Sequence, residues 1–354
     1  MNASEIDPYF MRTWLIASSI FIPFGVSENI LSVLVLIRPR FSDMPSRYTL
    51  IALSINDGLV LFFGMFRYWL VAVFEYNPMN YSLWSCKVLS YLVITLSHIS
   101  SGLVALVCVE RFFAIVYYYI LLPSKTIQIR GLYIVYFSSL FVNLHVIFNT
   151  ILKENETNST DFSCTSLNWN TAMAVDIIDS ILLCFCPLFV ILFSNGCIIV
   201  KLRKVSNQMQ QNTRPNKVSM SSPLKQKRLL SITMNDNSSQ ITCHCSNVVS
   251  KKYQSYHRKR WKPWKRDTQV TIMLLFVSFV FLFCNFPFGV VHLLRTYVNG
   301  ENTPTRPWDM AWISTYLLVY FNNCINFPIY IISQSVFRNH VISLLSCKKI
   351  NKRL

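Results

Sequence analysis

Seven long apolar stretches set the strongest limit on how this chain can fold. Each is long enough to cross a bilayer, which takes about 20 predominantly apolar residues in a helix. The chain is 53% hydrophobic and only 14% charged, whereas soluble domains carry roughly 25% charged residues. The sequence therefore predicts an all-α membrane protein, a seven-transmembrane helix bundle with spans at residues 14–37, 48–73, 86–119, 131–151, 171–202, 267–294 and 308–332.

The positive charges predict how the bundle is oriented in the bilayer. Most of the 33 Lys and Arg residues lie in the segments that follow the first, third, fifth and seventh spans. Because short loops rich in these residues stay in the cytosol, we expect an extracellular N-terminus and a cytosolic C-terminus. The expected partner of the basic, aromatic segment 251–266 is the anionic surface of the lipid bilayer, with nucleic acid as the weaker alternative.

Two further features fall on the predicted outer side. Glycosylation sequons begin there at Asn2, Asn80, Asn155 and Asn158, and we expect glycosylation at Asn2, Asn155 and Asn158. Cys86 and Cys164 also lie on that side, in an oxidising compartment. We therefore expect these two cysteines to form a disulfide.

The rest of the chain divides into tails and one long cytosolic segment. Residues 1–13 form an extracellular tail, spans one to five occupy 14–202, and spans six and seven occupy 267–332. Between them, residues 203–266 are rich in Ser, Asn, Gln and Lys and are predicted to be largely disordered.

The last segment, 333–354, is predicted to contain a short amphipathic helix on the inner leaflet, followed by a tail. The apolar face of that helix comprises Val336, Phe337, Val341, Leu344 and Leu345. Cys347 comes directly after it and is a candidate for lipidation, although a plain thiol is equally compatible with the sequence.

Polar motifs inside the spans narrow the class of membrane protein. In order along the chain they are GVSEN (25–29), LSINDGLVL with Asp57, ERF with Arg111, FLFCNFP (281–287) and NFPIY (326–330). Together with Trp84, Cys86 and Pro187, they resemble the motifs of rhodopsin-like (class A) G-protein-coupled receptors. The resemblance covers the chain apart from 203–265 and departs at Asn285, where the family usually has tryptophan.

The resemblance implies a plasma-membrane receptor that signals through a heterotrimeric G protein and also binds arrestin. It makes Arg111 the switch residue at the cytosolic end of helix 3, paired with Glu110 and with Asp267 of helix 6 in the resting state. Outward movement of helix 6 would release Arg111 and open a cleft for the G protein. Asn326 and Tyr330 of helix 7 belong to the same switch.

A second buried charge, Asp57, resembles the acidic centre of the family's sodium pocket. Ser100, Asn322 and Asn326 occupy matching positions around it, and oxygen ligands suit a hard cation. The alternative is a protonated Asp57 in a polar hydrogen-bonded network. Apart from this possible allosteric sodium ion, no cofactor is expected.

The resemblance also bears on the ligand. Val93 stands where amine receptors carry an aspartate, and Tyr320 stands where opsins carry their retinal lysine. The outer third of the bundle instead combines charges of both signs with aromatic rings, in Arg67, His98, Asp176, Asp179, His292, Arg295, Tyr316 and Tyr320. Such a mixture suits an extracellular peptide. We expect a neuropeptide receptor in which Asp176 or Asp179 binds an arginine of the ligand, with a non-peptide small molecule as the alternative.

The sequence also bears on two other function classes, a transporter and an enzyme. A solute transporter could use Asp57 as its coupling site, but paired broken helices are not evident in the sequence. An enzyme is not expected, because no nucleophile–base spacing or phosphate-binding loop is recognisable.

Overall fold

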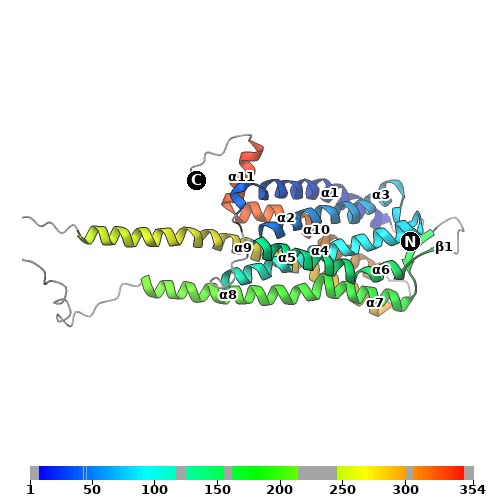
Figure 1. Ribbon diagram of the computed structural model, residues 1–354. Coiled ribbons are helices and arrows are strands. Elements are labelled where there is room, and N and C mark those ends of the chain that lie inside the picture. The colour runs from blue at the N-terminus through cyan, green and yellow to red at the C-terminus, as the bar shows by residue number, and fades with distance from the viewer. Residues whose placement is uncertain are drawn as a thin grey trace, which may run out of the picture. The chain divides into compact units, whose positions relative to one another are not determined.

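A computed structural model describes the backbone of residues 8–42, 44, 46–116, 125–154, 162–213, 245–299 and 306–346 (Figure 1). Within these ranges it describes the side chains of residues 11–39, 41–42, 44, 46–116, 125–154, 162–208, 269–298 and 307–346. Two compact units emerge, Met1–Ile199 with Gln269–Leu354, and Val200–Thr268. The helix bundle belongs to the first unit.

Long helices make up most of the described chain, and two of them contain a π-helical turn. The helical elements are α1 (Pro8–Leu36), η1 (Pro39–Phe41), α2 (Arg47–Val60), the π-turn η2 (Leu61–Met65), α3 (Phe66–Phe74), η3 (Pro78–Asn80), α4 (Leu83–Val116), α5 (Lys125–Val142), α6 (Leu144–Asn149), α7 (Trp169–Ser180), the π-turn η4 (Ile181–Phe185), α8 (Cys186–Thr213), α9 (Cys245–Asn299), α10 (Arg306–Ser333) and α11 (Ser335–Leu345).

The helices agree with the predicted seven spans. Among the described residues, six helical runs between Met11 and Val298 are long and apolar enough to cross a membrane. The seventh span is α10, which has 28 residues but is less apolar. It carries Asn322, Asn323 and Asn326, whose side chains are buried. The all-α seven-helix bundle is therefore confirmed, with polar groups facing protein rather than lipid.

The ends of several helices differ from the predicted boundaries. The backbone of α1 already begins at Pro8, inside the predicted tail 1–13, and proline is well suited to the first turn of a helix. In the second unit, α8 continues to Thr213 and α9 begins at Cys245. Residues 214–244 lie outside the described range, so disorder in 203–266 stays a prediction.

A β-hairpin that the sequence did not predict follows the fourth span. Strands β1 (Thr150–Glu154) and β2 (Phe162–Ser166) pair antiparallel, with Leu152 opposite Cys164. The fourth helix therefore ends at Asn149, because from Thr150 the backbone hydrogen bonds go to β2. The predicted disulfide is confirmed: Cys86 at the start of α4 is bonded to Cys164. We call this end of the bundle the hairpin end and the opposite end the α11 end (Figure 1).

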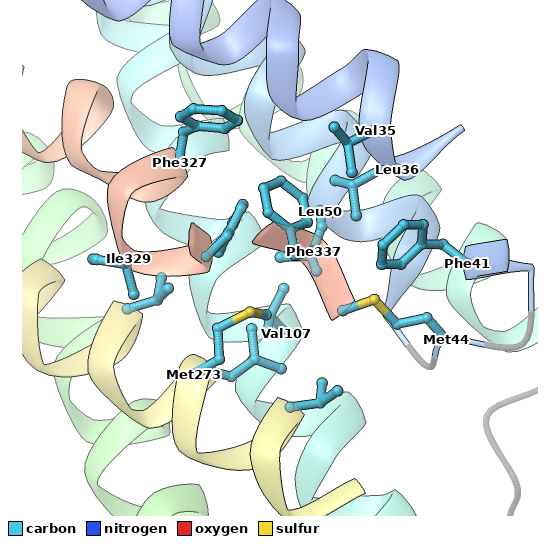
Figure 2. Close-up of a cluster of buried hydrophobic side chains, with 14 of the residues drawn as sticks. Val35, Leu36, Phe41, Met44, Leu50, Val107, Met273, Phe327, Ile329 and Phe337 are labelled. Atoms are coloured by element: carbon cyan, nitrogen blue, oxygen red, sulfur yellow. The ribbon is translucent and has the colours of Figure 1, made fainter. Parts of the chain in front are cut away.

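An apolar cluster holds the α11 end together (Figure 2). It joins the ends of α1, α2, α4, α9 and α10 to α11 through side chains that include Val35, Leu50, Val107, Met273 and Phe337. Burying a side chain of this size typically contributes about 1.5–3 kcal/mol, so the cluster fixes α11 against the bundle.

The apolar face predicted for α11 is correct except at one position. Phe337 and Val341 are buried, and Val336 and Leu344 pack against the cluster. Leu345, in contrast, is 70% exposed. It lies in the last turn of α11, beyond the reach of the cluster.

Gly25 in α1 provides a test of this packing. A Cβ atom there would lie 2.5 Å from Leu61 Cδ1 and 2.6 Å from Cys324 Sγ, and both neighbours are buried. We expect Gly25→Ala to lower the free energy of unfolding by about 1–3 kcal/mol, measured by thermal denaturation in detergent. Gly196→Ala is the matched control, because nothing lies within 4 Å of its added Cβ, and it should be neutral or stabilising. Equal effects of the two variants would contradict this packing.

Candidate functional site

A buried carboxylate joins three helices in the middle of the bundle. Asp57 of α2 is 0% exposed. Its Oδ1 accepts a hydrogen bond from Ser100 Oγ of α4 at 2.5 Å, and its Oδ2 accepts one from Asn326 Nδ2 of α10 at 2.8 Å. Both oxygens therefore have donors, as burial of a polar group requires.

Asn323 extends this network to a fourth helix. Its Oδ1 accepts from Ser100 Oγ at 3.3 Å, and its backbone carbonyl accepts from Asn29 Nδ2 of α1 at 2.9 Å. The residue predicted for this place from the sequence is the neighbouring Asn322. The pair of adjacent asparagines is the signal for this network, but only helix rotation decides which of them faces Ser100.

Asn322 faces a small cavity beside the network. The cavity is lined by Ser97, Ser100, Ser101, Leu183, Phe281, Asn285, Val319, Asn322 and Asn323. The cavity has a volume of about 10 Å³, which is roughly the room that one water molecule needs. Asn285, where the family usually has tryptophan, donates its Nδ2 hydrogen to Phe281 O of its own helix at 2.9 Å. This smaller side chain therefore borders a polar cavity in the bundle centre.

The oxygen atoms at Asp57 and its neighbours suit the sodium ion that the resemblance implies. Asp57, Ser100 and Asn323 bring carboxylate, hydroxyl and amide oxygens together, the ligand types that hard cations prefer. Sodium binding stays a prediction, with Asp57 and Ser100 as its best-placed ligands.

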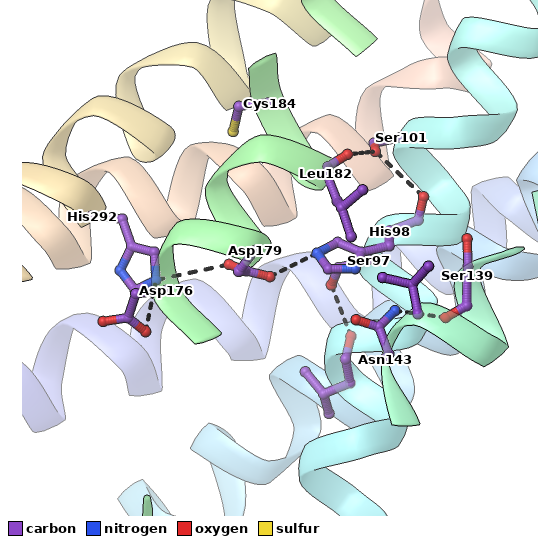
Figure 3. A network of polar contacts seen from close by, with 12 residues as sticks. Ser97, His98, Ser101, Ser139, Asn143, Asp176, Asp179, Leu182, Cys184 and His292 are labelled. Carbon is purple, nitrogen blue, oxygen red and sulfur yellow. Dashed lines mark hydrogen bonds and ion pairs between the residues drawn. The ribbon is translucent and has the colours of Figure 1, made fainter. Parts of the chain in front are cut away.

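A chain of acidic and imidazole groups connects three helices nearer the hairpin end (Figure 3). His98 Nε2 of α4 lies 2.8 Å from Asp179 Oδ1 of α7. His292 Nε2 of α9 lies 3.8 Å from Asp179 Oδ2 and 3.4 Å from Asp176 Oδ1. Thr296 Oγ1 donates to Asp176 Oδ2 at 2.6 Å. Four of the eight predicted ligand-binding residues thus contact one another.

The remaining predicted ligand-binding residues form two further groups. Arg295 forms an ion pair with Asp309 at 2.9 Å and lies over the ring of Trp312. Arg67 lies over the ring of Tyr68, while Tyr320 donates its hydroxyl hydrogen to Tyr316 at 3.2 Å.

Asp309, the partner of Arg295, was not predicted from the sequence. An acid in the first turn of a helix is common, so its position alone indicated no site.

Three of the predicted switch residues, Glu110, Arg111 and Tyr330, lie toward the α11 end. Arg111 is only 3% exposed, and Glu110 beside it is also buried. Glu110 Oε1 accepts a hydrogen bond from Thr49 Oγ1 of α2 at 2.7 Å, a partner that the sequence analysis missed. Tyr330 is buried in the apolar cluster, whereas Asn326 bonds Asp57. The side chain of Asp267 lies outside the described residues, so its pairing with Arg111 stays a prediction.

Asn2, Asn155, Asn158 and Cys347 lie outside the described residues, and their modification stays a prediction.

Glu28 of α1 was not predicted as a site residue, although an acid inside an apolar stretch is a usable signal. It is 8% exposed.

Comparison with known proteins gives one long match and several short ones. The family model described as "7 transmembrane receptor (rhodopsin family)" matches residues 28–330. "Dopamine receptor 3" of Caenorhabditis elegans is 34% identical over 98 residues, 27% of this chain and 16% of that protein. "Dopamine receptor 3" of Caenorhabditis briggsae is 33% identical over 98 residues, with the same shares of each chain.

"Melatonin receptor type 1B-B" of Danio rerio is 28% identical over 105 residues, 30% of this chain and 29% of that protein. The chain thus spans less than a third of the length of each of these three relatives.

The contact between His98 and Asp179 should be measurable as a coupling energy. We expect the double-mutant cycle of His98→Ala and Asp179→Ala to give about 1–3 kcal/mol in the free energy of unfolding, because the buried His98 and the partly buried Asp179 share a hydrogen bond. Ser97→Ala is the control, since its hydroxyl bonds Val93 O of its own helix. A His98–Asp179 coupling no larger than the Ser97–Asp179 value would contradict the contact.

Proposed function

Because the chain belongs to the rhodopsin family of seven-transmembrane receptors, we propose that it binds an extracellular ligand and activates a heterotrimeric G protein. The observation that carries this proposal is the burial of Arg111 at the α11 end of α4. In this proposal the hairpin end faces outward, the α11 end faces the cytosol, and arrestin is a second cytosolic partner. Membership of this family implies a membrane protein, and a receptor rather than an enzyme.

The packing around Arg111 supports a mechanical role for helix α9. Val107, one turn before Arg111, belongs to the same apolar cluster as Val270 and Met273 of α9. Movement of this end of α9 away from α4 would separate these side chains and uncover the end of α4 that carries Arg111. Because opening would lose these apolar contacts, the closed arrangement is favoured in the absence of ligand. A ligand must therefore bind the open arrangement more tightly than the closed one.

Glu110 supports the same mechanism from the other side. Its hydrogen bond to Thr49 holds the carboxylate against α2. A buried acceptor that loses its donor is costly, so this bond favours the arrangement in which Glu110 stays buried.

We further propose that the ligand presents a cationic group to Asp176 and Asp179. Both carboxylates lie close to His292. A permanently charged group of the ligand can replace the imidazole, because charge-assisted hydrogen bonds to carboxylates are strong. The Nδ1 atom of His292 and the Nε1 atom of Trp312 are buried without a hydrogen-bond partner in the described chain. In this proposal these two atoms offer the ligand further hydrogen bonds.

Two ligand classes carry such a cation. An arginine of a short peptide suits the mixture of charges and rings near the hairpin end. A small amine is the second candidate, because two relatives are titled dopamine receptors, and dopamine is an amine. Val93 stands where amine receptors of the family carry their aspartate, so an amine would have to use Asp179 of α7 instead. The transporter alternative is not favoured, because the family match covers most of the chain.

The receptor mechanism predicts opposite effects for two neighbouring substitutions. Arg111→Ala should lower nucleotide exchange on a reconstituted G protein at least about tenfold, because the switch cation is lost. Thr49→Val should raise exchange in the absence of ligand, because Glu110 loses its donor in the closed arrangement. Arg130→Ala, at an exposed arginine of α5, is the control and should change neither rate. An active Arg111→Ala variant would refute the mechanism.

The ligand class is tested with probes that differ only in charge. We expect short arginine peptides to stimulate exchange, and the same peptides with neutral citrulline in place of arginine to do so at least about tenfold more weakly. Asp179→Asn should reduce the arginine response to the citrulline level, and Asp176→Asn should weaken it. Stimulation by dopamine but by no peptide would favour the second candidate. Equal responses to arginine and citrulline peptides would exclude the cation.

A further inference from the structure

Arg67 of α3 is a cation in aromatic surroundings. Its guanidinium lies 4.4 Å from the centre of the Tyr68 ring, which in turn contacts the rings of Tyr316 and Tyr320. Its Nη1 contacts the thioether sulfur of Met79, which is neutral and a weak acceptor. A guanidinium has five N–H donors, so these contacts use only a small part of its capacity.

The charge of Arg67 is not neutralised by a carboxylate. Among the side chains that the structure describes, no Asp or Glu forms an ion pair with it. Arg295 in the same part of the bundle differs, because Asp309 lies 2.9 Å from it. Arg67 is half-buried, so its charge is partly shielded from water, and charges shielded in this way are normally paired. An arginine without an acid at this place points to an anionic partner from outside the chain.

A continuous row of rings connects Arg67 to the acidic groups. Tyr68 contacts Tyr316, with ring centres 6.2 Å apart, and Tyr316 stacks on Phe288 at 5.1 Å. Phe288 stacks on His292 at 5.1 Å, and His292 in turn contacts Asp176 and Asp179. The cation and the two acids therefore lie at opposite ends of one row of aromatic rings.

We propose that Arg67 binds a carboxylate of the ligand, so that the ligand is dipolar: its cation contacts Asp176 and Asp179, and its anion contacts Arg67. This inference rests on the proposed function and adds the acidic pole to it. The Tyr68 ring lies against the guanidinium, and five N–H donors leave enough for the two parallel N–H···O bonds that a carboxylate accepts. A peptide with a free C-terminus and a small amino acid both supply this chemistry.

The experiment uses two pairs of probes in which only the carboxylate differs. The first is a set of arginine-containing tetrapeptides made with a free C-terminal acid and with a C-terminal amide. The second is free arginine and agmatine, which lacks the carboxylate. Binding is measured as thermal stabilisation of the full-length chain in lipid nanodiscs. We expect the acid member of at least one pair to bind roughly tenfold to a hundredfold more tightly than its partner.

Variants assign this difference to Arg67. Arg67→Gln should remove the preference for the acid, and Arg67→Lys, which keeps the charge but not the paired donors, should retain part of it. Lys87→Gln removes one positive charge near the hairpin end and should leave the preference unchanged. A preference that survives in Arg67→Gln, equal binding of both members of each pair, or binding of no probe would overturn the inference.

The same measurements separate this inference from the proposed function. Suppose that the unsubstituted chain binds acids and amides alike, and that Asp179→Asn abolishes binding of every probe. The cation site then stands and the role of Arg67 falls. If Arg67→Gln removes the acid preference while Asp179→Asn has no effect, the anionic pole stands and the proposed cation site falls.

Discussion

The buried carboxylate of Asp57 is the constraint on which the bundle depends. A carboxylate without donors would be very unfavourable in this environment, so α4 and α10 must present Ser100 and Asn326 at the correct depth and rotation. Asn29 and Asn323 extend the requirement to α1. Because these contacts specify four helices at once, they set the relative heights at which side chains of these four helices meet.

The two ends of the bundle use different interactions around this centre. At the α11 end, apolar side chains from six helices form one cluster, and Arg111 is buried one turn beyond Val107. Toward the hairpin end, the helices are joined by polar contacts such as His98 with Asp179, and by stacked rings such as Phe288 with Tyr316. Apolar packing resists separation without specifying a partner, whereas polar contacts can be exchanged for those of a ligand. The cavity beside Ser100 and Asn285 lies between the two regions.

Local pattern accounts for what could be predicted and for what could not. The apolar spans and the disulfide cysteines were recognisable because length, charge bias and compartment leave few alternatives. The hairpin at Thr150 was not, because its short strands gain stability from pairing and from the Cys86–Cys164 bond rather than from their own sequence. Leu345 was assigned to the buried face because periodicity identifies a helical stripe, but not where the cluster that covers it ends.

The sequence by itself determined the number and order of the helices and the positions at which polar groups lie within them, since these follow from composition and spacing along one segment. Only the tertiary structure decided the partners: Asp179 with His98 and His292, Arg295 with Asp309, and Arg67 with rings but no acid among the described side chains. The physical reason is that most of these partners lie on different helices. The distance between two such side chains depends on the rotation and height of each helix, which only the packing of the whole bundle sets.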